Sequence, residues 1–239
     1  MLRLRIKAPF AVFRRFSAGS YRPTAPLPAP TTAYGLLLNI AAIETRHDDG
    51  HSSMTVTAAG LPGCELALGL FRYPEVSVLF QQLHEYPVGR DLDKKIRQSG
   101  ATALEDSHGA KYGIRPVSRE LLSDLDMYIC MRGNDDLEDR VRDGFREGAG
   151  FSPGGATRYG IPFLGDNNLM LSHLYEDHAA QPVHWMRRAV PGSSRGRTTQ
   201  LPVWIDRADM TRTRSVLFYC DEFVSMSTPE DAWTPVGPH

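Results

Sequence analysis

Cysteine and lysine are both scarce in this chain of 239 residues. The three cysteines, Cys64, Cys130 and Cys220, are odd in number and far apart, so neither a disulfide framework nor a CxxC metal site is indicated. A reducing cytoplasm fits this usage. Only four of the 27 basic residues are lysines. The planar guanidinium of arginine suits phosphate recognition and base stacking, although a GC-rich genome produces the same bias.

Long apolar runs and nucleotide-binding motifs are also missing. The longest apolar run, residues 36–43, is interrupted by Asn39 and falls far short of the roughly 18 residues that cross a bilayer. This excludes a membrane span, while 41% apolar content suffices for an ordinary soluble core. Residues 148–165 contain six glycines but no G-K-[ST], so a phosphate-binding P-loop is not supported and no cofactor is expected.

Acidic residues are absent from the first 43 positions, although the net charge of the whole chain is only -1. Six basic residues precede the first acid, Glu44: Arg3, Arg5, Lys7, Arg14, Arg15 and Arg22. A near-neutral protein with one positive end can hold phosphates locally. An organelle transit peptide is the alternative, but apolar and basic residues alternate over residues 2–7, which favours a half-buried strand.

A proline-rich spacer leads from these arginines to a predicted helix. Four prolines between residues 21 and 30 restrict φ and predict an extended segment. Thr31 or Thr32 then supplies an N-cap hydroxyl, and the apolar spacing predicts a helix from near Thr32 to Glu44. Since helix starts attract phosphate, Arg14, Arg15 and Arg22 are the candidate partners of a polyanion there.

The rest of the chain predicts an α+β fold. Strands are expected at residues 2–9, 65–71, 76–83 and 125–131, with 65–71 and 76–83 forming a β-hairpin. Asn134 caps a second helix that ends near Gly148. This order predicts a ferredoxin-like (βαββαβ) domain over residues 1–150, with a protruding insertion at about 84–115. Residues 151–239 form a Gly/Pro-rich connection and a small β region, with strands at 201–205 and 215–223.

Ser20-Tyr21-Arg22, the prolines after it and T-x-Y-G-L from Thr32 together resemble the CRISPR-associated Cas-five family, the RAMP-type subunit of type I Cascade complexes. The stretch from Arg158 to Asn168 is similar to a type I-B-like branch of that family. The resemblance implies a non-catalytic cytoplasmic subunit that caps the 5′ handle of a CRISPR RNA and contacts the backbone and large subunits and, in the complex, target DNA. The 84–115 insertion would be its thumb. Outside this insertion, the RNA-binding residues that the resemblance implies are Arg14, Arg15, Ser20, Tyr21, Arg22, Thr32, Tyr34 and Arg158.

A second candidate site lies within the insertion. His108, Lys111, Tyr112 and Arg115 fall in one segment, which suits RNA contact. The same residue types allow metal-independent RNA cleavage, since His or Tyr can deprotonate a 2′-OH and Lys can stabilise the phosphorane. An endoribonuclease that processes precursor CRISPR RNA is therefore the alternative function, and a plain charged loop is the third reading.

The final quarter of the chain offers two weaker patterns. Arginines at positions 187, 188, 195, 197, 207, 212 and 214 could form an arm that follows a nucleic-acid backbone, or a solvated loop. The spacing of His173, His178 and His184 matches no usual zinc site, so surface histidines are expected instead.

Overall fold

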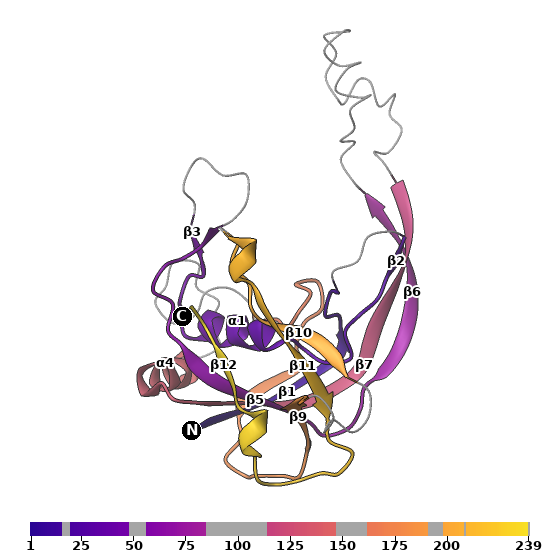
Figure 1. The fold of residues 1–239 in the computed structure, drawn as a ribbon. Coiled ribbons are helices and arrows are strands. Elements are labelled where there is room, and N and C mark those ends of the chain that lie inside the picture. The colour runs from indigo at the N-terminus through magenta and orange to yellow at the C-terminus, as the bar shows by residue number, and fades with distance from the viewer. Residues whose placement is uncertain are drawn as a thin grey trace.

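The structure, a computed structural model, describes residues 1–15, 20–47, 56–84, 114–146, 162–190, 198–207 and 209–238 (Figure 1). Its helices are α1 (Pro30–Ile40) and α4 (Asp135–Arg146), with 3₁₀ turns at Met210–Arg212 and Glu230–Ala232. The strands are β1 (Leu2–Ala11), β2 (Tyr21–Arg22), β3 (Arg46–His47), β4 (Val56–Thr57), β5 (Cys64–Leu70), β6 (Glu75–His84), β7 (Ile114–Arg132), β8 (His173–Glu176), β9 (His184–Arg188), β10 (Thr199–Trp204), β11 (Arg214–Cys220) and β12 (Thr234–Val236). In these residues no helix is long and apolar enough to cross a membrane.

One mostly antiparallel sheet organises the fold. Its strands lie in the order β10-β11-β9-β5-β7-β1-β8, while β12 pairs with β5 and a small separate sheet joins β3 to β4. The predicted strands at 201–205 and 215–223 are confirmed as β10 and β11, which belong to this same sheet. The expected domain boundary near residue 150 falls outside the described residues. The fold is therefore α+β, as predicted.

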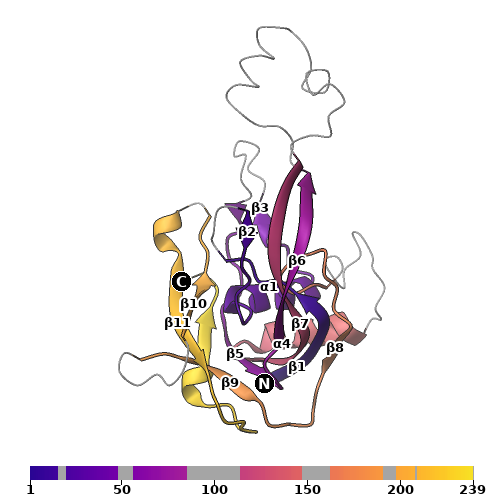
Figure 2. The ribbon, with the colours of Figure 1, turned by 90° about the vertical axis from the view of Figure 1, so that its right-hand side faces the viewer.

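The predicted hairpin between residues 65–71 and 76–83 is wrong. The two strands do not pair with each other but lie end to end along the 19-residue β7, with Leu66 opposite Met131 and Val76 opposite Leu122. The four residues between them are enough for a hairpin loop, but β5 pairs with residues 127–132 of β7 and β6 pairs with residues 114–123 of the same strand. The hairpin is instead formed by β6 and β7, which rise together above the rest of the sheet (Figure 2).

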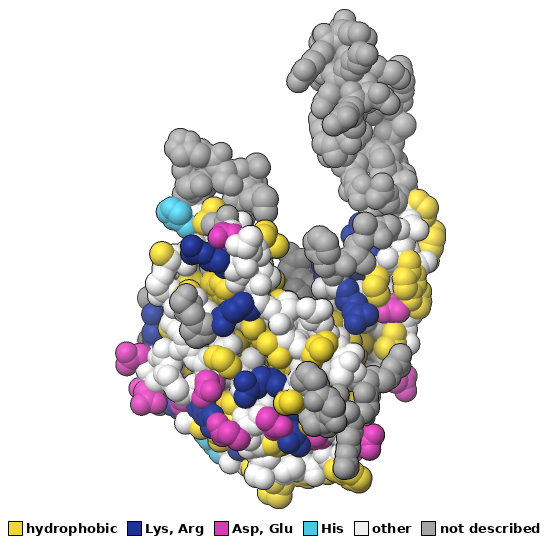
Figure 3. Space-filling model, in the orientation of Figure 1, with side chains coloured by type: hydrophobic (Ala, Val, Ile, Leu, Met, Phe, Trp, Pro, Cys, Tyr) yellow, Lys and Arg dark blue, Asp and Glu magenta, His cyan; other side chains and the backbone are white. Residues whose placement is uncertain are grey.

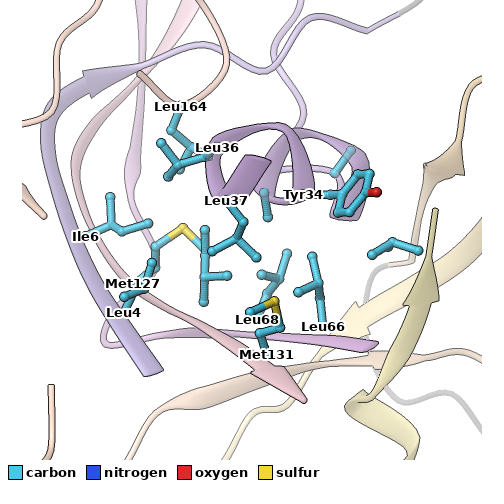
Figure 4. Packing of buried hydrophobic residues seen from close by; sticks show 14 of the residues in the cluster. Leu4, Ile6, Tyr34, Leu36, Leu37, Leu66, Leu68, Met127, Met131 and Leu164 are labelled. Carbon is cyan, nitrogen blue, oxygen red and sulfur yellow. The ribbon is translucent and has the colours of Figure 1, made fainter. Parts of the chain in front are cut away.

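Alternation along β1 gives the sheet its two faces. Leu2, Leu4 and Ile6 are fully buried on the face that carries the helices, while Arg3, Arg5 and Lys7 lie on the other face. Both helices cover the first face, where Leu37 of α1 reaches toward Leu68 and Met127 of the sheet (Figure 4). The period-two pattern thus predicted the strand correctly, and the structure extends it to Ala11.

The two helix starts differ from each other and, in one case, from expectation. Asn134 caps α4 as predicted, since its Oδ1 accepts from the backbone N of Leu137 at 2.9 Å. The expected threonine cap of α1 is wrong. The helix begins at Pro30, its N-cap Ala29 makes no side-chain bond, and the Thr31 hydroxyl donates to the carbonyl of Pro202 on β10 at 3.3 Å. Proline suits the first helical position because it needs no N–H partner there.

Candidate nucleic-acid interface

The proline-rich segment follows the sheet instead of projecting from it. We call residues 20–30 the strap. Phe13 donates its backbone N–H to Thr24 Oγ1 at 2.9 Å, and the N–H of Ala25 donates to the Phe13 carbonyl at 2.8 Å. Tyr21 and Arg22 pair in parallel with residues 118–119 of β7. The strap is therefore extended, as the prolines predicted, and its first residues lie alongside the middle of the β6–β7 hairpin (Figure 1).

Glu120 of β7 holds the strap in place. One carboxylate oxygen accepts from the Tyr21 hydroxyl, and the other accepts from the backbone N of Thr24 at 2.9 Å. The hydrogen bond to Glu120 also raises the pKa of Tyr21. The Tyr21 side chain nevertheless remains 50% exposed. An aromatic ring is thus presented to solvent in a defined position.

Two arginines share one buried carboxylate beside the strap. We call Arg14, Arg119 and Asp166 the arginine cluster. Asp166 has a fully buried side chain, and its Oδ2 accepts from Arg119 and, at 3.1 Å, from Arg14 Nη2. Burial alone would raise the pKa of Asp166, but the N–H of Asn168 and the two guanidinium groups outweigh it and hold that pKa below its usual value.

The arginine cluster keeps a surplus positive charge at the surface. The Arg14 side chain is 67% exposed, whereas that of Arg119 is 12% exposed, so Arg14 is the member that solvent or a ligand can reach. Arg15 is exposed close by and donates to Thr199 Oγ1 at 3.3 Å. A cation whose position is set by a buried carboxylate is well suited to a phosphate contact.

The structure brings five of the sequence-predicted residues to one place. They are Arg14, Arg15, Ser20, Tyr21 and Arg22, at the end of β1 and along the strap. Neither Arg119 nor Asp166 was expected from the sequence. Asp166 is the only acidic residue in the stretch from 158 to 168, and this isolated acid was the available signal.

Other predicted residues lie elsewhere. The Tyr34 ring is only 3% exposed and its hydroxyl donates to the Pro62 carbonyl at 2.6 Å, so Tyr34 belongs to the core. Burial also raises its pKa. Thr32 is half-buried on α1.

Three of the predicted contacts cannot be placed. His108, Lys111 and Arg158 lie outside the described residues. Of Arg115 only the backbone is described, on β7 opposite Leu83.

The earliest basic residues are engaged in tertiary ion pairs. Arg5 forms a two-pronged pair with Asp126, with Nε–Oδ1 and Nη2–Oδ2 distances of 3.0 and 2.9 Å, and Lys7 approaches the same carboxylate at 3.4 Å. The Arg5 guanidinium also lies 3.9 Å from the ring centroid of Phe71. These two cations therefore stabilise the sheet, whereas Arg14 and Arg15 lie exposed at the surface.

The second basic stretch is also partly structural. Arg187 lies on β9 and pairs with Asp231 at 2.6 Å and Asp221 at 3.4 Å, and Arg212 pairs with Asp209 at 3.2 Å. Arg187 is thus unavailable to an arm that follows a nucleic-acid backbone. Within the described part of the chain, no group of three or more His, Cys, Asp or Glu side chains is placed to hold a metal ion.

These features define an α+β protein whose mostly antiparallel sheet carries both described helices on one face and a proline-rich strap beside a projecting hairpin. The sequence model of the family described as CRISPR-associated protein (Cas_Cas5) matches residues 1–153. Since this is more than half of the chain, the chain belongs to the CRISPR-associated Cas5 family, as its N-terminal motifs predicted.

Two relatives illustrate the similarity. The CRISPR-associated protein Cas5 of Myxococcus xanthus (strain DK1622) is 24% identical over 220 residues, which cover 90% of this chain and 87% of that protein. A chain in a solved structure titled CRISPR RNA-guided surveillance complex is 15% identical and superposes with a TM-score of 0.53, covering 93% of this chain and 90% of the other. The two chains therefore share a fold.

Proposed function

We propose that this protein is a non-catalytic subunit of a type I Cascade complex that binds the 5′ handle of a CRISPR RNA. Two observations carry the proposal: the exposed Arg14 is held by the buried Asp166, and the strap presents the half-exposed ring of Tyr21. Phosphate contact by a fixed guanidinium and stacking on an aromatic ring are the two means by which proteins hold single-stranded RNA. Membership of the Cas5 family supports the same role.

The arrangement of elements supports a RAMP domain as its basis. We take β1-α1-β5-β7-α4 within residues 1–150, completed by β8 at His173–Glu176, as a ferredoxin-like βαββαβ unit, since its strands lie in the order β8-β1-β7-β5. Residues 84–115 would then be the thumb at the tip of the β6–β7 hairpin, and residues 151–239 a connection followed by a reduced C-terminal β region.

The chemistry of the strap argues against catalysis there. Between residues 20 and 30 the side chains offer Arg22 and Tyr21 but no histidine or lysine. Arginine does not lose its proton in proteins, and the pKa of Tyr21 is raised by its bond to Glu120, so neither group is a good base for a 2′-OH at neutral pH. The alternative function, a metal-independent endoribonuclease, would depend on His108 and Lys111.

Protein partners are supported by the surface of β6. Val76, Val78 and Phe80 are 58, 60 and 66% exposed and point to one side of the strand. Apolar side chains gather along this hairpin in Figure 3. We assign this side of β6 to contact with the backbone subunit of the complex. The large subunit and target DNA would be further partners of the protein, in the cytoplasm. Base pairing with the guide would then read the target sequence.

The test is RNA retention by the assembled complex. We expect the triple variant Arg14→Glu, Arg15→Glu, Arg22→Glu to lose most of its guide RNA, because three positive side chains become negative and repel the phosphates. The matched control is Arg140→Glu, which reverses one exposed arginine on α4. Full retention by the triple variant would refute the proposal.

A separate assay tests the alternative. The purified chain is incubated with precursor repeat RNA in EDTA, and cleavage at one site that His108→Ala abolishes would show the endoribonuclease instead.

A further inference from the structure

A groove crosses the solvent side of helix α1. It consists of two cavities, of about 410 and 550 Å³, that share the lining residues Thr31, Gly35, Thr45 and Arg46. Residues 31, 35 and 39 repeat at helical spacing along its floor, on the face of α1 opposite the core. Each volume lies in the range of about 300 to 1,000 Å³ that is typical of ligand sites. The groove is therefore large enough for a ligand with several rings.

Aromatic side chains stand at both ends of this groove. Trp204, at the end of β10, lines the first cavity together with Ile205 and Leu38. Phe163 lines the second cavity and is 40% exposed. The bond from Thr31 to the Pro202 carbonyl ties β10 to α1 and so holds Trp204 at the rim. Flat apolar surfaces are thus available at two separated points.

The charge of the lining is positive. The lining contains two cations, Arg46 and Arg207, and one acid, Glu44, which accepts from Arg46 Nε at 3.3 Å. The Arg46 side chain is 61% exposed despite this pair. Together with the hydroxyl of Thr45, the groove offers cations and a hydrogen-bonding group around apolar surfaces. This combination favours a ligand that carries both flat rings and anionic groups.

The groove adjoins the arginine cluster. Gly165 and Asn167 line the second cavity, and Asp166 between them is the carboxylate that holds Arg14. Gly165 has a positive φ of 92°, and a Cβ there would lie 2.4 Å from the Val12 carbonyl, so this loop packs tightly on the chain that leads to Arg14. The loop that holds Arg14 therefore also forms part of the wall of the groove.

We infer that the groove over α1 binds unpaired nucleotides of the guide RNA, with Trp204 and Phe163 each stacking on a base and with Arg46 and Arg207 contacting phosphates. The inference rests on the proposed function and extends it from the strap to a second, base-binding surface. Single-stranded RNA is recognised in this way, by aromatic stacking combined with backbone contacts.

Gly35 allows the groove to be blocked without disturbing the core. A Cβ at this position would meet no atom within 4 Å, so Gly35→Gln places its side chain in the groove. Glutamine also favours a helix more than glycine does, so α1 is not weakened. Trp204→Leu removes the stacking ring and keeps an apolar contact, and Arg140→Gln on α4 is the control.

The experiment uses the assembled complex with guide RNA that carries 4-thiouridine at single handle positions. After irradiation, we expect crosslinks to groove peptides that contain Trp204 or Phe163. Both variants should lower that crosslinking about tenfold, while crosslinks to the strap persist. Arg207→Gln should reduce the salt dependence of RNA release, whereas Trp204→Leu should not.

The outcomes separate the two claims. Crosslinks to the strap but none to the groove overturn this inference and leave the proposed function standing. Crosslinks to neither surface overturn both claims.

Discussion

The buried carboxylate of Asp166 allows a sharp test of the arginine cluster. In Asp166→Asn the side chain keeps its shape and one oxygen, so the backbone N–H of Asn168, now bonded at 3.0 Å, keeps an acceptor. The negative charge that faces Arg14 and Arg119 is lost. Arg119, whose side chain is only 12% exposed, then becomes a partly buried cation without its partner carboxylate.

The expected cost follows from burial. Removing one partner of a buried ion pair costs about 3–5 kcal/mol. Arg14 is 67% exposed and contributes little to that figure because water screens it, so the loss comes mainly from Arg119. Because asparagine retains the bond to Asn168, we expect the lower end of the range, about 3 kcal/mol of unfolding free energy.

The pH dependence has a definite sign. The folded-state pKa of Asp166 lies below its unfolded value, so its stabilising effect is complete above the unfolded pKa of about 3.9 and is lost as the pH falls through the folded pKa. The difference in stability between the native chain and Asp166→Asn should therefore be constant from pH 7 to about pH 5, and should shrink below about pH 4.

Urea unfolding of the full-length chain measures this difference. The matched control is Asp124→Asn, which removes the same charge from an exposed pair in which Arg72 and Asp124 are 59 and 70% exposed. That control should cost no more than about 1 kcal/mol. If both variants lose the same small amount, the assignment of Asp166 as the compensating charge of a buried arginine is refuted.

Two further predictions concern packing and assembly. Gly144→Ala should lower the unfolding free energy measured in urea by about 1–3 kcal/mol, because a Cβ there would lie 2.2 Å from the Ile40 carbonyl. The control Gly35→Ala should be neutral or stabilising, since a Cβ there meets no atom within 4 Å. Equal effects of the two substitutions would contradict the close contact between the helices. Phe80→Glu should reduce co-purification with the backbone subunit without changing the unfolding midpoint. The control Phe223→Glu, at a side chain that is 79% exposed, should leave co-purification unchanged. Loss of co-purification in both variants or in neither would contradict our assignment of β6.

Local rules were sufficient for much of the secondary structure. The alternation over residues 2–7 predicted β1, and the amide of Asn134 before an acidic turn predicted the start of α4. Both depend on contacts within a few residues, so the sequence contains all that they require. The start of α1 was missed because the Thr31 hydroxyl bonds to Pro202, 171 residues away, and the helix begins with a proline instead.

Pairing between distant segments was beyond such rules. Residues 65–71 and 76–83 resemble two arms of a hairpin, yet both pair with β7, which offers them one continuous edge. Likewise, the positive charge of Arg5 is neutralised by Asp126, 121 residues later. A count of charges along the chain cannot show which cations remain at the surface.

The sequence by itself determined that this protein has an N-terminal strand, an extended proline strap and an arginine-rich end, because steric limits on φ and the period of apolar residues act locally. Only the tertiary structure decided which arginines are presented to a ligand. Asp166 reaches Arg14 across 152 positions, and the same loop closes one end of the groove over α1. Burial of that single carboxylate, which no local pattern specifies, places the exposed guanidinium beside the groove.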